Sequence, residues 1–550
     1  MKWESGKAMT IGLLRGTGYG LGAHASKYAQ EDRTMLRVLR DQALSRPDHP
    51  WLICDQVDQL SFGQGWNLVN QIGNALRMSV GVGAHVALLM QNQIEFMPAF
   101  YGAQVNHGVV VPLNAQSRGS HLEYVISKSD SLVLIVRDSL FERIEELESI
   151  GAVKLIVVVG SAPRVESLHE ARVVGWADWL KDSKNTEFGE LPSWTDSAVI
   201  QFTSGTTGRS KGVLFSHHYL YMSSAVVADS LERTPQDILF TPMPLFHVGA
   251  LHFVANSSIH AGCTAHLVSS FSPTKYWEQV AASGATFSII LGPMAALVDK
   301  VTQIVPKHAL QTIFCVPPPP NCAAFEAKFG IEVLWQGYGM TEVHAMPGRR
   351  HLLAGNIPGM LGKPVDWVDF GVVDEHDNLL APNEVGELVF RSLLPHAMIS
   401  EYYKEPEITV RAFRNFMFHT GDLASYDEQG IVYFKGRQQD RIRRRGEMVG
   451  AIEVESVVLT HPEIMEAAVY PVPSEFGEDD IKLDFVSEGE MDLHALREWC
   501  EKALPKYMVP RYFEQRLSFP KTPSERIEKY RIREDLLDRK NVFDAEGNRK

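Results

Sequence analysis

The sequence predicts an α/β protein with more than one hydrophobic core. Apolar runs rich in β-branched residues occupy residues 86–90, 108–113, 132–136 and 154–160, and helix-like segments alternate with them. This alternation is typical of parallel strands that are covered on both faces. The chain has 550 residues, whereas one core usually supports no more than about 250–300. A multidomain α/β protein is therefore expected.

Later segments indicate further structural units. The runs SIIL at 288–291 and TIFCV at 312–316 suggest a second series of parallel strands. Between 362 and 434 the strands become shorter and are broken by Gly, Pro and Asp, which favours a small barrel or an antiparallel sheet. A charged stretch, DRIRRRGE, begins at Asp440 and precedes helix and strand signals in IEVESVVLTH and EAAVYPVP. The predicted domains are residues 1–439 and residues 440–550.

Composition narrows the class of protein. The formal net charge is −14, which argues against a nucleic-acid partner because phosphate backbones are bound by net basic faces. Five cysteines are scattered without CxxC pairs, as in proteins of a reducing compartment. No window reaches ~18 consecutive apolar residues, and neither a convincing signal peptide nor a carboxyl-terminal Ser-Lys-Leu address is present. A cytoplasmic protein without a membrane span is expected.

The stretch TSGTTGRSKG, from Thr203 to Gly212, predicts a phosphate-binding loop. Glycines let the backbone approach an anion, hydroxyl and N–H groups donate hydrogen bonds, and Lys211 adds a positive charge. A Walker loop would need Ser or Thr directly after the lysine, where this chain has Gly212. A Ser/Thr/Gly linker is the alternative, although linkers rarely follow a buried strand and carry a placed lysine.

This stretch resembles the signature of adenylate-forming enzymes, the superfamily of acyl-CoA ligases, nonribosomal-peptide adenylation domains and beetle luciferase. Further matches follow in the order of the family: WQGYGMTE at 335–342, GELVF at 386–390, FHTGDL at 418–423 and YFKGRQQDRIRRRGEMV at 433–449. The likeness covers roughly residues 35 to 535. It implies a large N-terminal domain of two αβ subdomains plus a small β-barrel, followed by a small mobile α+β C-terminal domain that swings on a hinge at Asp440.

The resemblance assigns phosphate contacts to two of these motifs. Thr341 would contact the α-phosphate of ATP, and Glu342 would hold Mg²⁺, a hard cation that prefers oxygen ligands. Taken alone, a Thr-Glu pair is more often a helix start or a surface pair. The residues that would lie along the β- and γ-phosphates are Thr203, Ser204, Gly205, Thr206, Thr207 and Lys211.

The nucleoside would be held by residues from several motifs. By the resemblance, Asp422 would accept hydrogen bonds from both ribose hydroxyls, and Arg437 would add a donor at the sheet edge. Capping of an Asx-turn is the alternative role for Asp422. The remaining nucleotide contacts are assigned to Val316, Pro317, Tyr338 and Gly339.

The acyl group would lie beside the α-phosphate in an apolar pocket. His247, in MPLFHVGAL, falls where the family keeps an aromatic residue or a histidine beside the acyl carboxylate; a satisfied core histidine is the alternative. Apolar lining selects shape only weakly, so the acid itself is not specified. The candidate walls are Phe246, Val248, Leu251, Leu291, Trp335 and Gly337.

Two departures from the family pattern bear on adenylation. The adenine loop reads VPPPP from Val316 to Pro320, where the family usually has Gly-Ala-Pro, and proline fixes φ and removes N–H donors. The family pattern Pro-Lys-Thr-x-x-Gly-Lys-Ile is replaced by PKTPSERI at 520–527. Arg526 thus stands where a lysine bridges the carboxylate and the α-phosphate, and Glu525 replaces the neighbouring glycine.

The change at Arg526 predicts slow adenylation. Arginine presents a wide planar fork where a compact ammonium is expected, and loss of a placed charge donor typically costs ~10²–10³ in rate. Lys521 or Lys529 could substitute only after a shift in register, because both already match other positions of the family.

The second half-reaction, attack of CoA on the acyl-adenylate, does not need that lysine. By the resemblance, rotation about Asp440 presents the loop around Gly446 to form a pantetheine tunnel, and Arg444 and Glu447 keep the pattern of this region. The arginine cluster at 441–445 would lie near the phosphoadenosine of CoA. A solvated surface is the alternative reading of this cluster.

The resemblance therefore implies an acyl-CoA ligase that acts on a largely apolar carboxylic acid with ATP, Mg²⁺ and CoA. Three alternatives stay open: a ligase that only thioesterifies a preformed acyl-AMP, an adenylation enzyme that loads a carrier protein, and a noncatalytic acyl-adenylate sensor. Mg²⁺ is needed only if adenylation is retained. A separate adenylating enzyme and a homodimer are left open as partners.

Overall fold

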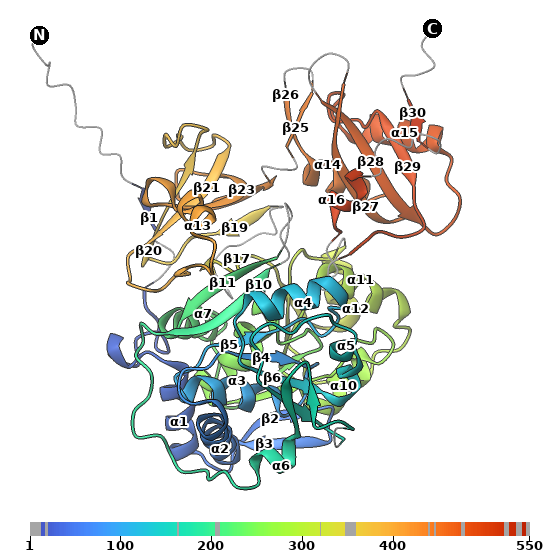
Figure 1. Cartoon of the computed structure of the whole chain (residues 1–550). Coiled ribbons are helices and arrows are strands. Elements are labelled where there is room, and N and C mark those ends of the chain that lie inside the picture. Colours follow the sequence, from blue (N-terminus) through green and yellow to red (C-terminus); the bar gives the residue numbers. More distant parts are fainter. Residues whose placement is uncertain are drawn as a thin grey trace, which may run out of the picture.

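The computed structural model places the predicted units in three large sheets and a smaller C-terminal sheet (Figure 1). The structure describes residues 13–16, 20–161, 164–203, 210–319, 321–346, 359–437, 441–444, 447–474, 479–521, 527–534 and 542–545.

The first sheet has nine strands and contains the four apolar runs predicted near the amino terminus. Its strands from β10 to β9 run parallel, and antiparallel pairs occur only where β22, β11 and β8 are added at the edges. The predicted parallel arrangement is confirmed. In spatial order the strands are β22 (Glu401–Tyr402), β11 (Lys211–Ser216), β10 (Ser197–Thr203), β5 (Val110–Pro112), β4 (Val86–Leu89), β6 (Val133–Arg137), β7 (Leu155–Val159), β9 (Ala171–Gly175) and β8 (Ser167–Leu168).

The second sheet has seven strands and contains the runs predicted at 288–291 and 312–316. All neighbouring pairs are parallel except the hairpin between β2 and β3. The strand order is β16 (Glu332–Leu334), β15 (Thr312–Cys315), β14 (Phe287–Ile290), β12 (Ile238–Thr241), β13 (Thr264–Leu267), β2 (Pro50–Cys54) and β3 (Asp58–Ser61).

The two parallel sheets share one hydrophobic core. Helix α3 (Phe96–Val105) is buried over its whole length, as expected for a helix that is apolar on every side. Helix α7 (His217–Ser230) is buried almost as completely. The core joins Val110 of the first sheet and Leu239 of the second with Phe100 of α3.

Local signals explain where several helices begin. Helix α2 (Phe62–Val80) starts with a capping box, in which Ser61 and Gln64 exchange backbone-to-side-chain hydrogen bonds of 2.9 and 3.2 Å. Ser216 caps α7 through its hydroxyl group, which accepts a hydrogen bond of 3.0 Å from the backbone N–H of Tyr219. The other helices of this part are α1 (Met35–Ser45), α4 (Gly119–Lys128), α5 (Glu142–Glu145), α6 (Trp176–Leu180), α8 (Val248–Ala250), the π-helical η3 (Leu251–Asn256), α9 (Ser257–Ala261), α10 (Tyr276–Ser283), α11 (Gly292–Val301) and α12 (Cys322–Phe329).

The region with short strands forms a six-stranded antiparallel sheet, as the broken strand pattern predicts. Helix α13 (Pro406–Ala412) belongs to the same part of the chain. The strand order is β1 (Leu14–Arg15), β20 (Val368–Val373), β21 (Gly386–Ser392), β23 (Phe418–Tyr426), β24 (Val432–Arg437) and β19 (Met360–Gly362).

The C-terminal part is an α+β unit with cores of its own, and Figure 1 shows it set apart from the two parallel sheets. A ribbon of β25 (Arg441–Arg444) and β26 (Glu447–Gly450) precedes it. Its sheet has the order β27 (Ile464–Pro473), β28 (Asp479–Ser487), β29 (Tyr512–Gln515) and β30 (Phe543–Asp544), with helices α14 (Ala451–Val458), α15 (Leu493–Ala503) and α16 (Lys529–Glu534). Asp440 lies outside the described residues, and the domain boundary there stays a prediction.

The cysteines and helices agree with the sequence analysis as far as they are described. All five cysteines carry free thiols, and four of them are buried. Burial raises the pKa of the Cys54, Cys263 and Cys500 thiols to about 12. None of the helices in the described part of the chain is long and apolar enough to cross a membrane.

Buried histidines are a further feature of the N-terminal part of the chain. Burial lowers the pKa of His217 to about 3 and the pKa of His218, His266 and His344 to about 4. Each of these imidazoles is therefore neutral in the folded protein at neutral pH, whereas an unfolded histidine has a pKa of about 6.5.

These histidines should make the fold sensitive to acid. Above pH ~6.5 they are neutral in both states and contribute nothing to pH dependence. Between pH ~6.5 and ~4 the unfolded chain takes up protons that the folded chain refuses, so each histidine should lower the free energy of unfolding by ~1.4 kcal/mol per pH unit. We expect a lower thermal unfolding midpoint at pH 5 than at pH 7, and a shallower decline in His266→Phe. An unchanged midpoint at pH 5 would contradict this account.

Candidate active site

The predicted phosphate loop joins two antiparallel strands of the nine-stranded sheet. Thr203 ends β10 and lies opposite Lys211, the first residue of β11. This register brings the two ends of the loop together and leaves Lys211 half-buried at its base. Four predicted loop residues, Ser204, Gly205, Thr206 and Thr207, lie outside the described residues.

Tyr402 connects Lys211 with Glu342. Strand β22 pairs with β11, which places the Tyr402 ring 5.3 Å from the Lys211 Nζ atom. The Tyr402 hydroxyl donates a hydrogen bond of 2.8 Å to Oε1 of Glu342. Burial raises the pKa of the Glu342 carboxyl, while the hydrogen bond from Tyr402 and the charge of Lys211 act in the opposite direction. The Tyr402 ring thus lies next to the Lys211 ammonium group, while its hydroxyl group contacts the buried Glu342 carboxylate.

Glu342 and Thr341 occupy the turn between β17 (Tyr338–Met340) and β18 (Val343–Met346). The Thr341 carbonyl accepts a hydrogen bond of 2.9 Å from the hydroxyl of Tyr219 on α7. The Glu342 carbonyl accepts one of 3.3 Å from the backbone N–H of Ile399. This turn is therefore fixed to α7 and to the chain that enters β22, and Thr341 stays half-buried beside it.

Asp422 is the centre of a second polar group. The Tyr338 hydroxyl donates a hydrogen bond of 2.7 Å to Oδ2 of Asp422, and Arg437 Nε lies 3.5 Å from Oδ1. Arg437 is the register partner of Asp422 in the pair of β23 and β24. Charge repulsion from Asp422 contributes to the raised pKa of Glu342, so the two carboxylates belong to one electrostatic site.

Glu387, from the GELVF segment, positions the part of β23 that carries Asp422. Its carboxylate accepts hydrogen bonds of 2.9 Å from His419 Nδ1 and 3.0 Å from the backbone N–H of Gly421. Burial opposes ionisation of Glu387, but these hydrogen bonds and the nearby Arg414 outweigh it and lower its pKa. Gly421 has φ = 72°, a left-handed conformation that favours glycine.

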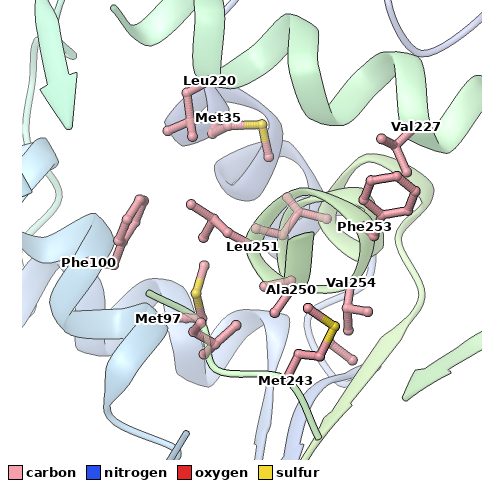
Figure 2. Packing of buried hydrophobic residues seen from close by; sticks show 14 of the residues in the cluster. Met35, Met97, Phe100, Leu220, Val227, Met243, Ala250, Leu251, Phe253 and Val254 are labelled. Atoms are coloured by element: carbon pink, nitrogen blue, oxygen red, sulfur yellow. The ribbon is translucent and has the colours of Figure 1, made fainter. Parts of the chain in front are cut away.

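The predicted acyl pocket residues differ in their surroundings. His247 is half-buried, with its ring centroid 4.5 Å from that of Phe246. Leu251 is fully buried, and Figure 2 shows it on the side of the helix that faces Phe100 and Met97. Val248, Leu291 and Trp335 are partly buried against the same core, and Gly337 is buried just before β17. Their roles as pocket walls stay predictions.

The proline-rich loop follows β15. Val316 and Pro317 are exposed, and Gly292 at the start of α11 packs so closely that a Cβ atom there would lie 2.7 Å from the Pro317 carbonyl oxygen. Gly339 is exposed on β17, next to the buried Tyr338. The nucleotide contacts assigned to these residues stay predictions.

The C-terminal candidates are only partly described. Arg444 is buried, with its guanidinium 3.4 Å from Asp480 and donating to the Val509 carbonyl. The contact between Arg444 and CoA stays a prediction. Asp440, Gly446 and Arg526 lie outside the described residues.

Both lysines that could replace the missing one form ion pairs. Lys521 Nζ lies 2.9 Å from Glu466, and Lys529 Nζ lies 2.7 Å from Glu455. These pairs hold the two lysines to the C-terminal unit itself. A shift in register that brought either into the site would have to break its ion pair.

Sequence reasoning missed Tyr402, Tyr219 and Glu387. Tyr402 and Tyr219 act through pairing and packing between distant segments, and no local pattern marks them. Glu387 belongs to the GELVF motif, which marks it as a candidate residue, but the motif alone indicates no role for it.

The chain matches two family models. Residues 39–403, more than half of the chain, match the model described as AMP-binding enzyme. Residues 453–526 match the model described as AMP-binding enzyme C-terminal domain.

Similar proteins match over most of the chain. The long-chain-fatty-acid–CoA ligase FadD13 of Mycobacterium tuberculosis is 29% identical over 513 residues, which cover 90% of this chain and 97% of that protein. The crotonobetaine/carnitine–CoA ligase of Citrobacter koseri is 28% identical, with 87% and 93% covered.

Solved structures of similar fold span nearly the whole chain. The anthranilate CoA ligase AuaEII in complex with anthranoyl-AMP has a TM-score of 0.83 at 22% identity, with 92% of this chain and 98% of that chain covered. The Mycobacterium tuberculosis fatty acyl CoA synthetase has a TM-score of 0.68 at 26% identity, with the same coverage.

Removing the Tyr402 hydroxyl should destabilise the fold. In Tyr402→Phe the buried Glu342 loses a donor, which should cost ~1–3 kcal/mol in the free energy of unfolding. The matched control is Tyr403→Phe, because the Tyr403 hydroxyl also donates to a carboxylate, Asp130, at 2.7 Å but in a more exposed place. Denaturant unfolding of both variants measures the difference. Equal effects of the two substitutions would contradict the role given to Tyr402.

Proposed function

The chain belongs to the AMP-binding enzyme family and is an acid–thiol ligase, and we propose that it joins a largely apolar carboxylic acid to CoA through an acyl-adenylate. The observation that carries this proposal is the convergence of Lys211, Glu342 and Asp422 at one site. A nucleotide needs a cation near its phosphates and an acceptor for its ribose, and this arrangement offers both.

The proposed site would bind ATP between the group around Lys211 and Glu342 and the group around Asp422. Lys211 and the loop that begins at Thr203 would hold the β- and γ-phosphates, and Thr341 would contact the α-phosphate. The Asp422 carboxylate offers acceptor oxygens, and Arg437 Nε lies 3.5 Å from Oδ1. Ribose hydroxyls are donors that suit such an acceptor.

The residues present fit a magnesium ion. The described part of the chain holds no group of three or more His, Cys, Asp or Glu side chains that could bind a metal by themselves. Mg²⁺ is commonly held by one or two carboxylates together with substrate phosphates. Glu342 would hold it, with one carboxylate oxygen kept in place by Tyr402, and the bound ion would neutralise charge on the phosphate oxygens.

Two bond exchanges make up the proposed reaction. A carboxylate oxygen of the acid attacks the α-phosphorus of ATP, and pyrophosphate leaves with the electron pair of the broken P–O bond. The CoA thiolate then attacks the acyl carbonyl carbon, and AMP leaves. The site contributes by positioning the reacting atoms and by placing donors where charge develops. His247, beside Phe246, is proposed to lie next to the acyl carboxylate, and rotation at Asp440 is proposed to separate the two steps.

A ligase that performs only the second exchange is the second candidate. It is favoured by Arg526 and Glu525 in the place of the lysine and glycine of the family. The ion pairs of Lys521 and Lys529 add support, because they leave neither lysine available without a rearrangement. A cytoplasmic location is part of the proposal and is supported by the five free thiols.

Paired turnover tests the proposal and separates the two candidates. Octanoic and phenylpropanoic acids with ATP and CoA should give acyl-CoA slowly, and the matching acyl-AMP with CoA should give it faster. Arg526→Lys should raise the rate from the free acid at least about tenfold and leave the rate from acyl-AMP unchanged, because only adenylation uses this position. If the unaltered protein and Arg526→Lys both form acyl-CoA from acyl-AMP and CoA, and neither forms it from the free acid and ATP, the second candidate would be favoured. Failure to form acyl-CoA from either substrate would overturn the proposed function.

A further inference from the structure

Two buried histidines lie beneath the turn that carries Thr341 and Glu342. His344 follows this turn on β18, and His252 belongs to the π-helical η3. Their ring centroids are 6.0 Å apart, and both side chains are buried. Neither belongs to the site residues assigned above.

The hydrogen bond of His344 fixes its tautomer. Its Nδ1 atom lies 3.1 Å from the Ser223 carbonyl oxygen. A carbonyl can only accept, so Nδ1 carries the proton. Burial lowers the pKa of this imidazole to about 4, and the ring is neutral at pH 7. Nε2 of His344 is therefore an unprotonated acceptor.

His252 has polar atoms that no described residue satisfies. Within the described part of the chain, neither ring nitrogen of this buried histidine has a hydrogen-bond partner. Burial lowers its pKa as well, so the neutral ring presents one N–H donor and one acceptor nitrogen. Buried polar groups are nearly always hydrogen-bonded to protein, to water or to a ligand.

The two histidines form part of an aromatic cluster. The Phe253 ring centroid lies 5.6 Å from that of His344 and 4.5 Å from that of Phe314, where β15 ends before the proline-rich loop. On the other side of His252, the Phe215 centroid lies at 6.4 Å. The cluster is thus largely apolar, with two neutral imidazoles as its polar members.

Phe253 reaches this cluster from the side of the π-helical η3 opposite Leu251. Residues two apart on such a turn face nearly opposite sides, and Figure 2 shows Leu251 and Phe253 on different sides of the helix. Leu251 faces the main core, while Phe253 turns toward the histidines. π-helical turns frequently occur at functional sites.

Gly339 and Tyr219 connect the cluster with the part of the proposed site where the acyl-adenylate would form. A Cβ atom on Gly339 would lie 2.8 Å from His344 Cδ2 and 3.4 Å from Nε2, so the ring packs directly on the strand that carries Tyr338. Tyr219, whose hydroxyl holds the Thr341 carbonyl, lies one helical turn before Ser223 on α7. A substrate group bound in the cluster would therefore lie close to an acyl chain that extends from the proposed α-phosphate position at Thr341.

We infer that the acid is a hydroxy acid, whose hydroxyl group donates a hydrogen bond to Nε2 of His344 and accepts one from the N–H of His252. This inference rests on the proposed function and names its substrate class. Two rings whose centroids are 6.0 Å apart can both reach one oxygen atom at ordinary N···O distances of about 2.8–3.0 Å. An unsubstituted acid offers no partner to either nitrogen, whereas a site built for a hydroxyl group rejects the analogue that lacks it.

Binding of matched acyl-adenylate analogues tests the inference. The probes are hydrolysis-resistant acyl-sulfamoyl adenosines in three pairs: phenylpropanoyl and para-hydroxyphenylpropanoyl, cyclohexanoyl and para-hydroxycyclohexanoyl, octanoyl and omega-hydroxyoctanoyl. Calorimetry should show the hydroxylated member binding at least about tenfold more tightly in at least one pair. His344→Phe and His252→Phe should each reduce that ratio toward one.

His266→Phe is the matched control. His266 is also buried with both ring nitrogens unpartnered among the described residues, but it lies on β13, next to Phe240. The hydroxyl preference should survive this substitution. If His344→Phe or His252→Phe fails to fold, the other variant and the hydroxyl preference of the unaltered protein still test the inference.

The outcomes separate this inference from the proposed function. Binding of the probes with no hydroxyl preference in any pair overturns the inference and leaves the adenylate site standing. A preference that survives both His344→Phe and His252→Phe also overturns it. Failure of every probe to bind overturns the proposed function, and the inference falls with it.

Discussion

The hydrogen bond from Tyr402 to Glu342 is the interaction on which the site depends. It joins the turn between β17 and β18 to strand β22, and β22 in turn pairs with β11, which begins at Lys211. The bond also supplies a hydrogen-bond donor to a carboxyl group whose pKa is raised by burial. Without it, hydrogen bonds to backbone carbonyls of the turn would still join the turn to Ile399 and Tyr219, but the Glu342 carboxylate would lose its contact with the strand that pairs with β11.

The charges of the site are balanced around this contact. Lys211 and Arg437 each stand beside one carboxylate, Glu342 and Asp422 respectively, and the two carboxylates repel each other. Such an arrangement suits a ligand that brings its own charge, because anionic phosphates would meet the lysine while the ribose meets Asp422. Glu387 keeps the segment of β23 around Asp422 in place through His419 and Gly421. The proposed acyl side is different, because the polar groups inferred there beyond His247 are the neutral imidazoles of His252 and His344.

Much of this architecture could be predicted from the sequence, because it depends on local patterns. The apolar runs at 86–90 and 154–160 indicate buried parallel strands, and Thr203, Lys211 and Asp422 stand in motifs whose composition suits phosphates and ribose. Residues such as Tyr402 and His344 could not be found this way, because their roles arise from contacts between segments far apart in the chain. The π-helical turn that separates Leu251 from Phe253 left no sequence signal either. Leu251 fits a pocket wall by its apolar character, yet its side chain is enclosed by the main core.

The central claim is that Lys211, Glu342 and Asp422 form one adenylate site. A crystal structure of the protein with bound octanoyl-sulfamoyl adenosine tests it most directly. The account predicts ribose hydroxyls on Asp422, the sulfamoyl group near Thr341 and Lys211, and the acyl chain beside His247. A nucleoside bound elsewhere, or a ribose that makes no hydrogen bond to Asp422, would contradict it.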